Sequence, residues 1–375
     1  MTIADQATDL LAGLGGEFID PPMVLPAAVP LELSGEAVRS RICTFVDGHS
    51  QEWALRPDLT LPVAIAETHL RKDGASGERL SRYRGRVFRM PVTQQDPIEY
   101  EQVGFEKFGA PRNVEQDVWL FSTLSQTSQA LGIETAFVSV GDLSVFPAFV
   151  DALGFPDDVA AGLKRAFRQA GGVDAYLAGL ERNRSGLAGR VAGMTKAEIE
   201  AFIEDIFAIT GVRPVGERRA DEIVERLAER SKSGAQFEVS AAQQAVLRQV
   251  LALDERLDKA PQTLATIATQ NGLAGLAETL DRFTARAEAL VEIARSSFGA
   301  VPRFATQFGR RFTYYDGLVF EFAASGDSDA VRRPFVAGGR YDSLLSELSD
   351  GQVAATAVGG ILIPHRMATL EGAAP

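Results

Sequence analysis

Polar and apolar residues alternate along two neighbouring stretches in the first third of the chain, and this alternation predicts a pair of antiparallel strands. The first strand runs from Tyr83 to Arg89 and the second from Ile98 to Phe108. The segment between them, Met90 to Pro97, is polar, contains proline and is too long for a tight hairpin turn. The pattern therefore predicts a hairpin with a long loop as the central element of the chain.

Three side chains of this hairpin have complementary chemistry. Arg89 ends the first strand, while Gln102 and Glu106 lie four residues apart on the second and so share one face. A cation, an amide and a carboxylate on one face of a sheet suit a small zwitterion. An ordinary solvated strand face with surface charges explains the same residues, and the pattern alone leaves both interpretations open.

Further periodic segments surround the hairpin. A period of 3.6 residues predicts helices over residues 3–14, about 60–71, 113–131 and 143–153, with Asn113 as a cap. Extended patterns predict strands over residues 18–25, 38–47, 52–56, 133–140, 312–322, 335–342 and 357–363, with a break at Asp316 and Gly317 in the fifth of them, and Pro364 opens a last helix. Strands and helices therefore mix at both ends of the chain.

The segment from Leu55 to Pro62 marks a change from strand to helix. The strand ends at Arg56 because Pro57 cannot continue the ladder, and Asp58 or Thr60 can cap the helix that follows. A capped helix start explains this pattern fully. The alternative is that Asp58 accepts a hydrogen bond from the amino group of a ligand at the end of the strand.

The middle of the chain, from Pro156 to Phe298, is helical in period almost throughout. Thr195 and Glu198 have the spacing of a capping box, and apolar stripes run over residues 239–253 and 276–294. We interpret this region as an insertion. The predicted division is a core in two parts, residues 1–154 and 299–375, with a helical insertion over residues 155–298.

The composition narrows the possible functions. The net charge of −12 over 375 residues argues against nonspecific binding to nucleic acid, which needs a dense lysine and arginine surface. Cys43 is the one cysteine, so no intrachain disulfide is expected, and the scattered His49, His69 and His365 do not suggest a metal site. Without an apolar run of membrane-spanning length or a signal-peptide pattern, we expect a soluble cytoplasmic protein that needs no metal or cofactor.

Four stretches, in their order and spacing, resemble the catalytic core of class II aminoacyl-tRNA synthetases, and specifically the histidyl branch. They are LRPDLT at 55–60, the hairpin that ends in YEQVGFEKFG at 109, RRFTYYDGLVFEF at 310–322 and AGGRYDSLL at 337–345. The resemblance implies an α+β fold, in which an antiparallel sheet is flanked by helices and carries a helical insertion. It also implies a dimer formed partly through residues 16–24.

The same resemblance implies a histidine-binding pocket. The α-amino group would contact Asp58, Thr60 and Gln102, the imidazole would contact Glu106 and Tyr315, and an arginine of the third stretch would meet the carboxylate. An ammonium needs acceptors and an imidazole needs a partner for each ring nitrogen, so this chemistry is reasonable. The residues that the matching motifs place in this pocket are Asp58, Thr60, Arg89, Gln102, Glu106, Arg310, Tyr314 and Tyr315.

The chain departs from synthetases in the expected ATP site. Pro91 replaces the acid two residues after the hairpin arginine, and the loop MPVTQQDPIE lacks the basic residues that would hold a triphosphate. Thr313 replaces an acid before the paired tyrosines, while Arg366 keeps part of the terminal motif. The sequence stops where an anticodon-binding domain would begin, so we expect no recognition of tRNA.

A histidyl-synthetase core with these departures is similar to the regulatory subunits of ATP phosphoribosyltransferase in bacterial histidine biosynthesis. That resemblance implies a noncatalytic chain that works in a hetero-octamer with a short-form catalytic subunit, is required for its activity and permits feedback by L-histidine. Two alternatives stay open. One is a truncated synthetase-like enzyme that adenylates histidine or a related amino acid, and the other is a scaffold with a vestigial pocket.

Overall fold

The computed structural model divides into two compact units, residues 1–145 with 250–375, and residues 146–249. It describes residues 1–34, 36–93, 96–185, 187–191, 193–210, 224–225, 227–228, 237–310, 314–325 and 333–371. The predicted boundaries at 155 and 298 enclose most of the second unit together with two long helices of the first. They stay a prediction of how the chain is organised.

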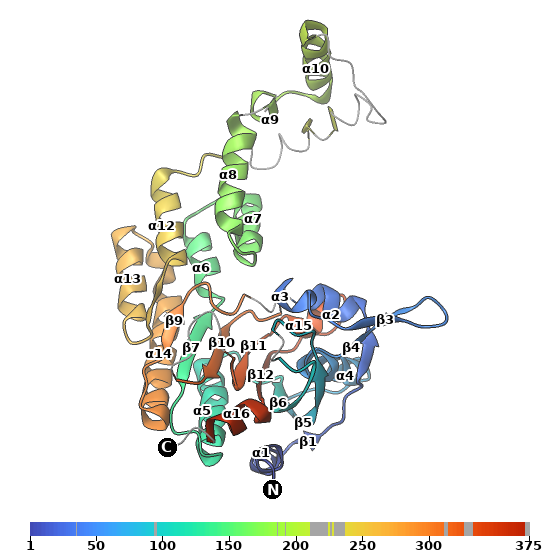
Figure 1. The fold of residues 1–375 in the computed structure, drawn as a ribbon. Helices are drawn as coiled ribbons and strands as arrows, with labels where there is room; N and C mark the ends of the chain where they lie inside the picture. Colours follow the sequence, from blue (N-terminus) through green and yellow to red (C-terminus); the bar gives the residue numbers. More distant parts are fainter. Residues whose placement is uncertain are drawn as a thin grey trace. The chain divides into compact units, whose positions relative to one another are not determined.

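The first unit is built on a large sheet, and nine of its strands lie in the described residues (Figure 1). Neighbouring strands are antiparallel, except that β1 pairs with β5, and β7 with β9, in parallel. In spatial order the strands are β1 (Glu17–Phe18), β5 (Arg79–Phe88), β6 (Glu99–Phe108), β12 (Ala357–Leu362), β11 (Val336–Arg340), β10 (Leu318–Ala323), β7 (Phe137–Asp142), β9 (Arg303–Ala305) and β8 (Asp254–Arg256).

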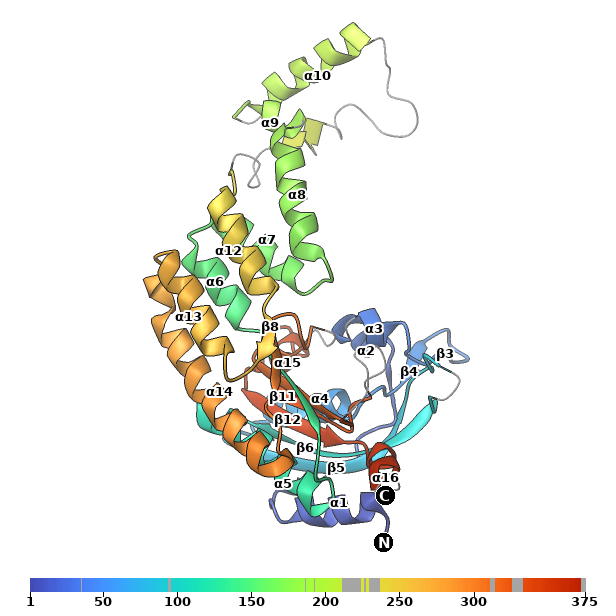
Figure 2. The ribbon, with the colours of Figure 1, turned by 60° about the vertical axis from the view of Figure 1, so that its left-hand side comes forward.

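A smaller sheet of the same unit has the order β2 (Val24–Pro26), β4 (Glu52–Leu55) and β3 (Thr44–Val46). Helices pack against the large sheet, and α2 contacts the smaller one (Figure 2). The helices of this unit are α1 (Ile3–Ala12), α2 (Ala28–Leu33), α3 (Glu36–Arg39), α4 (Thr60–Lys72), α5 (Val114–Ala130), α13 (Ala260–Gln270), the 3-10 turn η1 (Ala274–Leu276), α14 (Ala277–Phe298), α15 (Leu344–Glu347) and α16 (Pro364–Glu371).

The second unit is helical in its described residues. A stacked pair of rings, Phe146 and Phe167, packs two of its helices together at a centroid distance of 4.6 Å. Ile199 and Ile203 belong to a further apolar cluster at α10. The helices are α6 (Val145–Ala152), which begins at the boundary of the unit, α7 (Asp157–Phe167), α8 (Gly172–Ser185), α9 (Leu187–Arg190), α10 (Lys196–Thr210) and α12 (Ala241–Leu251), which ends beyond it.

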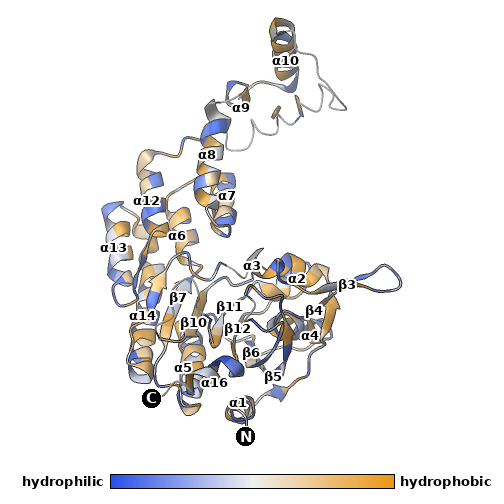
Figure 3. Ribbon diagram, viewed as in Figure 1, coloured by the Kyte–Doolittle hydropathy of each residue, from blue (hydrophilic) through white to orange (hydrophobic). Residues whose placement is uncertain are grey.

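Local sequence explains where several helices begin and end. The Asn113 side chain accepts a hydrogen bond from the Gln116 N–H at 3.1 Å, which confirms the predicted cap of α5. The predicted capping box of α10 is also confirmed, because Thr195 and Glu198 bond reciprocally. The predicted stripe over residues 276–294 is buried along α14, where hydrophobic and hydrophilic residues alternate in Figure 3. Gly299, at φ 62°, ends that helix in the left-handed conformation.

The two faces of the large sheet have different neighbours. One face carries Phe105 and Phe320, which meet aromatic rings of α5 at Trp119 and Phe121. The alternation of a strand places Gln102 and Glu106 on the opposite face. Both are fully buried, so the interpretation of an ordinary solvated strand face is wrong.

Two strand predictions are wrong at their starts, and the predicted break in a third is confirmed. Val38 lies in α3 rather than in a strand, so the predicted strand over 38–47 shortens to β3. β7 begins only at Phe137, because the Ile133 N–H still bonds to the carbonyl of Ser128 at the end of α5. β10 begins at Leu318, directly after the predicted break at Asp316 and Gly317, because the Asp316 carboxylate accepts from the Asp342 and Ser343 N–H groups and holds this segment away from the ladder. Residues 311–313, including Thr313, lie outside the described part.

Buried ion pairs connect the sheet to the helices on the face away from Glu106. Asp117 of α5 accepts from Arg286 of α14 at 2.9 Å and from Arg340 of β11 at 2.8 Å. Arg286 also pairs with Asp142 of β7, and Arg340 with Asp342 at 3.0 Å. Buried charges are tolerated only when paired, so this network holds α5, α14, β7 and β11 in one arrangement.

We expect Asp117→Ala to lower the free energy of unfolding by about 3 kcal/mol, because two buried arginines then lose a carboxylate. Urea unfolding measures the change. The matched control is Arg282→Ala, which removes an exposed pair with Glu278 and should cost less than about 1 kcal/mol. Equal effects of the two substitutions would contradict a structural role for the buried network.

Candidate functional site

Glu106 is the centre of a buried group of hydroxyl-bearing side chains. Its Oε1 accepts from the Thr60 hydroxyl and from the Tyr83 hydroxyl, each at 2.7 Å. Its Oε2 accepts from the Tyr341 hydroxyl. We call Thr60, Tyr83, Glu106 and Tyr341 the Glu106 cluster. Hydrogen bonds to a carboxylate of this kind are stronger than those between neutral groups, and they offset part of the cost of burying it.

Four separate elements supply this cluster. Glu106 lies on β6, Tyr83 lies on the paired strand β5, Thr60 opens α4 and Tyr341 follows β11. On β12, Gly359 lies directly opposite Glu106 in the ladder. A Cβ atom at that glycine would overlap Glu106 Oε2, so the carboxylate fits against the sheet only because the position lacks a side chain.

Burial dominates the electrostatics of the cluster. It raises the pKa of Glu106 from 4.5 to about 7, although the three hydroxyl donors act in the opposite direction. Burial and then the charge of Glu106 raise the pKa of Tyr83 and Tyr341 well above the usual value. Both tyrosines therefore keep their protons and serve as donors, while the protonation of Glu106 can change near neutral pH.

Asp58 is a second buried carboxyl group beside the cluster. Its Oδ1 accepts from the Leu61 N–H at 3.0 Å, which confirms that it caps the start of α4. Its Oδ2 is buried, and no residue in the described part of the chain forms a hydrogen bond with it. Burial raises the pKa of Asp58, and the nearby positive charge of Arg89 opposes that shift. The Arg89 side chain itself donates to the carbonyl of Pro57 at 2.7 Å.

Gln102 is the most unusual buried group of the site. Its side chain is fully buried on the same face as Glu106, and neither its amide oxygen nor its amide nitrogen has a hydrogen-bond partner among the described residues. Across the ladder, on β5, lies Gly85. A buried amide without partners costs free energy, so it indicates a group that is satisfied by something other than this chain.

Two consecutive tyrosines, Tyr314 and Tyr315, lie close to the ring of Tyr341. Tyr314 and Tyr315 are buried, and their rings lie 5.8 and 6.2 Å from the Tyr341 ring. Burial and then, for Tyr315, the charges of Glu106 and Asp58 raise the pKa, so this hydroxyl also stays protonated. Arg310 donates to the Gln307 carbonyl at 3.1 Å and takes no part in the hydrogen bonds described above. Its place in the site stays a prediction.

Sequence reasoning missed two members of the cluster. Tyr83 appeared as an ordinary ring of an alternating strand, and Tyr341 as part of the AGGRYD stretch, although both donate to Glu106. The only signal was periodicity, which puts Tyr83 on the core face of its strand. Nothing local indicates that Tyr341, 235 residues after Glu106, reaches the same carboxylate.

Arginines from distant segments flank the loop between β5 and β6. Arg41 donates to the Met90 carbonyl at 2.6 Å, and Arg333 pairs with Asp96 at 3.1 Å. Burial, and also the charge of Arg89, lowers the pKa of Arg41 and of Arg366. The loop itself has no basic residue, as the sequence analysis noted. In the folded chain, arginines from other segments bring positive charge to it.

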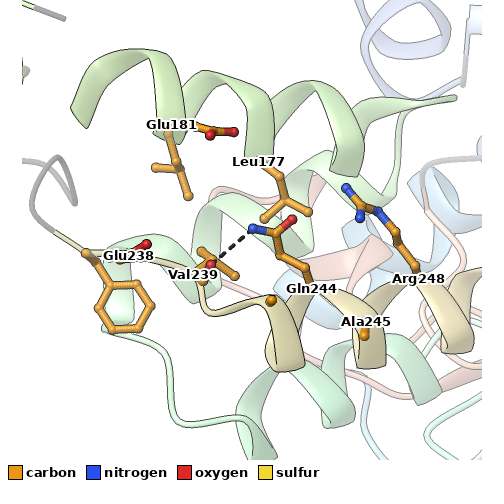
Figure 4. A pocket seen from close by; sticks show the side chains of 10 residues that line it. Leu177, Glu181, Glu238, Val239, Gln244, Ala245 and Arg248 are labelled. Carbon is orange, nitrogen blue, oxygen red and sulfur yellow. Dashed lines mark hydrogen bonds between the residues drawn. The ribbon is translucent and has the colours of Figure 1, made fainter. Parts of the chain in front are cut away.

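A separate groove of about 280 Å³ lies in the second unit, between α8 and α12 (Figure 4). Gln244 donates to the Val239 carbonyl at 3.1 Å within it, and Arg248 at its edge pairs with Asp174 at 3.4 Å. The polar side chains that line this groove are exposed or half-buried. Of the buried side-chain atoms without partners in the described residues, none belongs to this groove, whereas three belong to Asp58 and Gln102, so the site around the Glu106 cluster is the stronger candidate.

Metal sites and membrane-spanning helices were sought in the described part of the chain. There, no group of three or more histidine, cysteine, aspartate or glutamate side chains is arranged to hold a metal ion. No helix in that part is long and apolar enough to cross a membrane.

The raised pKa of Glu106 predicts how stability depends on pH. The folded chain binds this proton up to about pH 7 and the unfolded chain only up to about 4.5, so the contribution to stability falls between these values by about 3 kcal/mol. Glu106→Gln removes that dependence. Urea unfolding at pH 5 to 8 should therefore show that the free energy of unfolding of the variant rises relative to that of the wild type as pH rises. A difference that stays constant with pH would contradict the raised pKa of Glu106.

Comparison with known proteins places this arrangement in a family. The family model described as histidyl-tRNA synthetase matches residues 1–185 and 190–363. The ATP phosphoribosyltransferase regulatory subunit of Chelativorans sp. (strain BNC1) is 30% identical over 385 residues, which cover 100% of this chain and 98% of that protein. The protein of the same name from Brucella ovis is 32% identical over 340 residues, which cover 88% of this chain and 87% of that one.

Solved structures share the fold. A crystal structure described as an ATP phosphoribosyltransferase regulatory subunit/histidyl-tRNA synthetase from Bacillus halodurans matches with a TM-score of 0.63 at 20% identity, over 98% of this chain and 77% of that chain. A histidine–tRNA ligase subunit from Alicyclobacillus acidocaldarius matches with a TM-score of 0.56 at 22% identity, over 99% and 92%. The predicted α+β, class II synthetase-like fold is thereby confirmed. The chain belongs to the family of ATP phosphoribosyltransferase regulatory subunits, which is built on the histidyl-tRNA synthetase domain.

Proposed function

We propose that this chain is a regulatory subunit without catalytic activity of its own, and that it binds L-histidine beside the Glu106 cluster. Family membership supports the regulatory role, since the relatives carry that name. The observation that carries the ligand is that three of the nine buried side-chain atoms without partners in the described residues belong to this site, namely Asp58 Oδ2 and both polar atoms of the Gln102 amide. A buried site left unsatisfied in this way is completed by a ligand that both donates and accepts hydrogen bonds.

Histidine supplies the required donors. Its ammonium group would donate to Asp58 and to the amide oxygen of Gln102, next to Thr60 of the cluster. Its ring N–H would donate to Glu106, with Tyr314 and Tyr315 against the ring. The α-carboxylate would need a cation, for which Arg89 and Arg310 are the candidates from the motifs.

The partner in this proposal is a short-form catalytic ATP phosphoribosyltransferase subunit, in a hetero-octamer that works in the cytoplasm in the first step of histidine biosynthesis. The chain would favour the active conformation of the partner through contact. Histidine can reverse this only if it binds one state of the complex more tightly than the other. The alternative scaffold hypothesis differs in one respect, which is that histidine would not bind this chain.

A dimer of this chain is part of the same proposal. The segment expected to form it, residues 16–24, exposes apolar side chains in the isolated chain: Phe18 is 50% exposed, Met23 44% and Val24 40%. Phe45 and Val46 of the smaller sheet are also exposed. Clustered apolar exposure of this kind favours a protein contact, and a second copy is the partner we propose.

The decisive variant is Gln102→Leu, examined by isothermal titration of the full chain with L-histidine. We expect histidine binding to weaken at least about 10-fold, because a polar partner of the ligand is lost. We expect the free energy of unfolding to stay the same or rise, because the amide makes no hydrogen bond within the chain.

The matched control is Gln129→Leu on α5, which covers the opposite face of the sheet. Gln129 donates to the Ser297 carbonyl at 3.1 Å, so its loss should lower stability and leave histidine binding unchanged. If the wild-type chain did not bind histidine at all, the scaffold hypothesis would replace the proposal.

A second candidate function is adenylation of histidine or a related amino acid by this chain. The observation that favours it is the set of arginines around the loop between β5 and β6, since Arg41 and Arg366 lie within electrostatic range of Arg89. Positive charge of this kind can hold phosphate oxygens. The replacement of an acid by Pro91 still argues against a working ATP site.

ATP–pyrophosphate exchange with histidine and a panel of amino acids separates these two functions. Under the regulatory proposal we expect no exchange above background with the isolated chain. Amino-acid-dependent exchange that disappears in Arg89→Ala would establish the enzyme instead and refute the noncatalytic role.

A further inference from the structure

The Glu106 carboxylate has one hydrogen-bonding position to spare. An ionised carboxylate has about four lone-pair positions, two on each oxygen. The Thr60 and Tyr83 hydroxyls occupy both positions of Oε1, at 2.7 Å each. The Tyr341 hydroxyl occupies one position of Oε2. The fourth position, on Oε2, is not taken by any of these donors.

The titratable groups around Glu106 are three tyrosines and Asp58, and Arg89 acts on Asp58 in turn. Tyr83 of β5 and Tyr341 after β11 stay protonated, as does Tyr315 beside them. Asp58, at the start of α4, raises the pKa of Glu106 further after burial has done so. The positive charge of Arg89 acts on Asp58, whose pKa it lowers. Burial and the charge of Asp58 therefore favour the neutral form of Glu106 while no ligand is bound, and the three hydroxyl donors oppose them without cancelling their effect.

We propose that the fourth position on Glu106 holds either the carboxyl proton or a ring N–H of the ligand, but never both, so that the ligand binds only to the ionised carboxylate. This inference rests on the proposed function, because it concerns the ring end of the same site. In the binding step the carboxyl O–H bond breaks, its proton passes to the buffer, and a hydrogen bond from the ring N–H replaces it. The ligand is thereby specified as a heteroaromatic ring that carries an N–H group.

The probe must not take up the proton itself. Imidazole can accept a proton near neutral pH, whereas the ring of β-(1,2,4-triazol-3-yl)alanine carries an N–H and stays unprotonated there. We therefore titrate the full chain with this analogue at pH 6.5 and pH 8, in two buffers that differ in ionisation enthalpy. The dependence of the measured heat on the buffer gives the number of protons released.

With a Glu106 pKa of about 7, we expect release of about 0.8 proton at pH 6.5 and about 0.1 at pH 8. Glu106→Gln should release none at either pH. Tyr341→Phe serves as a second variant, which keeps the test valid if Glu106→Gln does not bind the analogue. It removes a donor to the carboxylate, which raises the pKa of Glu106 further, so release at pH 8 should exceed that of the wild type.

The outcomes separate this inference from the proposed function. Binding of the analogue without proton release at pH 6.5 overturns the inference and leaves a histidine site in place. Binding of L-histidine but not of the triazole analogue also overturns it, because a ring N–H should suffice. Failure of L-histidine itself to bind refutes the proposed function.

Discussion

The burial of the Glu106 carboxyl group is the constraint on which the construction of this site depends. A carboxyl group without access to water must find donors within the chain or remain protonated. Here three hydroxyls reach it, from the start of α4, from β5 and from the residue after β11. Each donor fixes the position of its own segment relative to β6. The sheet, the first turn of α4 and the end of β11 must therefore form together for the carboxyl group to be accommodated.

The opposite face of the sheet supports this arrangement. Arg340, the last residue of β11, points away from the site and pairs with Asp117 on α5, while the next residue, Tyr341, points toward Glu106. Alternation along a strand makes this division unavoidable. The ion pair between Arg340 and Asp117 on one face of the sheet thus fixes the position of Tyr341, whose hydroxyl donates to Glu106 on the other face. Gly359 completes the fit by leaving room for Oε2 beside the strand.

Two buried polar side chains of β6 differ in their hydrogen bonds, and this difference indicates a ligand site. Glu106 is well bonded within the chain, whereas Gln102, four residues earlier on the same strand, has a buried amide with no partner in it. Natural cores rarely keep such a group, because replacing it with an apolar side chain would gain stability. Sites that bind ligands are the usual exception, since they keep groups that only the ligand satisfies.

The sequence predicted the hairpin well and the three-dimensional site only in part. Period-two alternation located β5 and β6 within a few residues, and spacing placed Gln102 and Glu106 on one face. Their burial did not follow, because glutamine and glutamate usually face water. Tyr341 and the flanking Arg41 reach the site through strand order and loop packing, which no local pattern encodes. Val38 was assigned to a strand because alternation over a few residues also fits a short helix such as α3.

The central claim is that this chain regulates a partner by binding histidine beside Glu106. The most direct test is the rate of phosphoribosyl transfer by a short-form catalytic ATP phosphoribosyltransferase subunit, measured with this chain present and with increasing L-histidine. The account predicts that the chain raises the rate, that histidine lowers it again, and that with Gln102→Leu the rate stays high at the same histidine concentrations. Inhibition by histidine that is unchanged in that variant would place the feedback site elsewhere and contradict the claim.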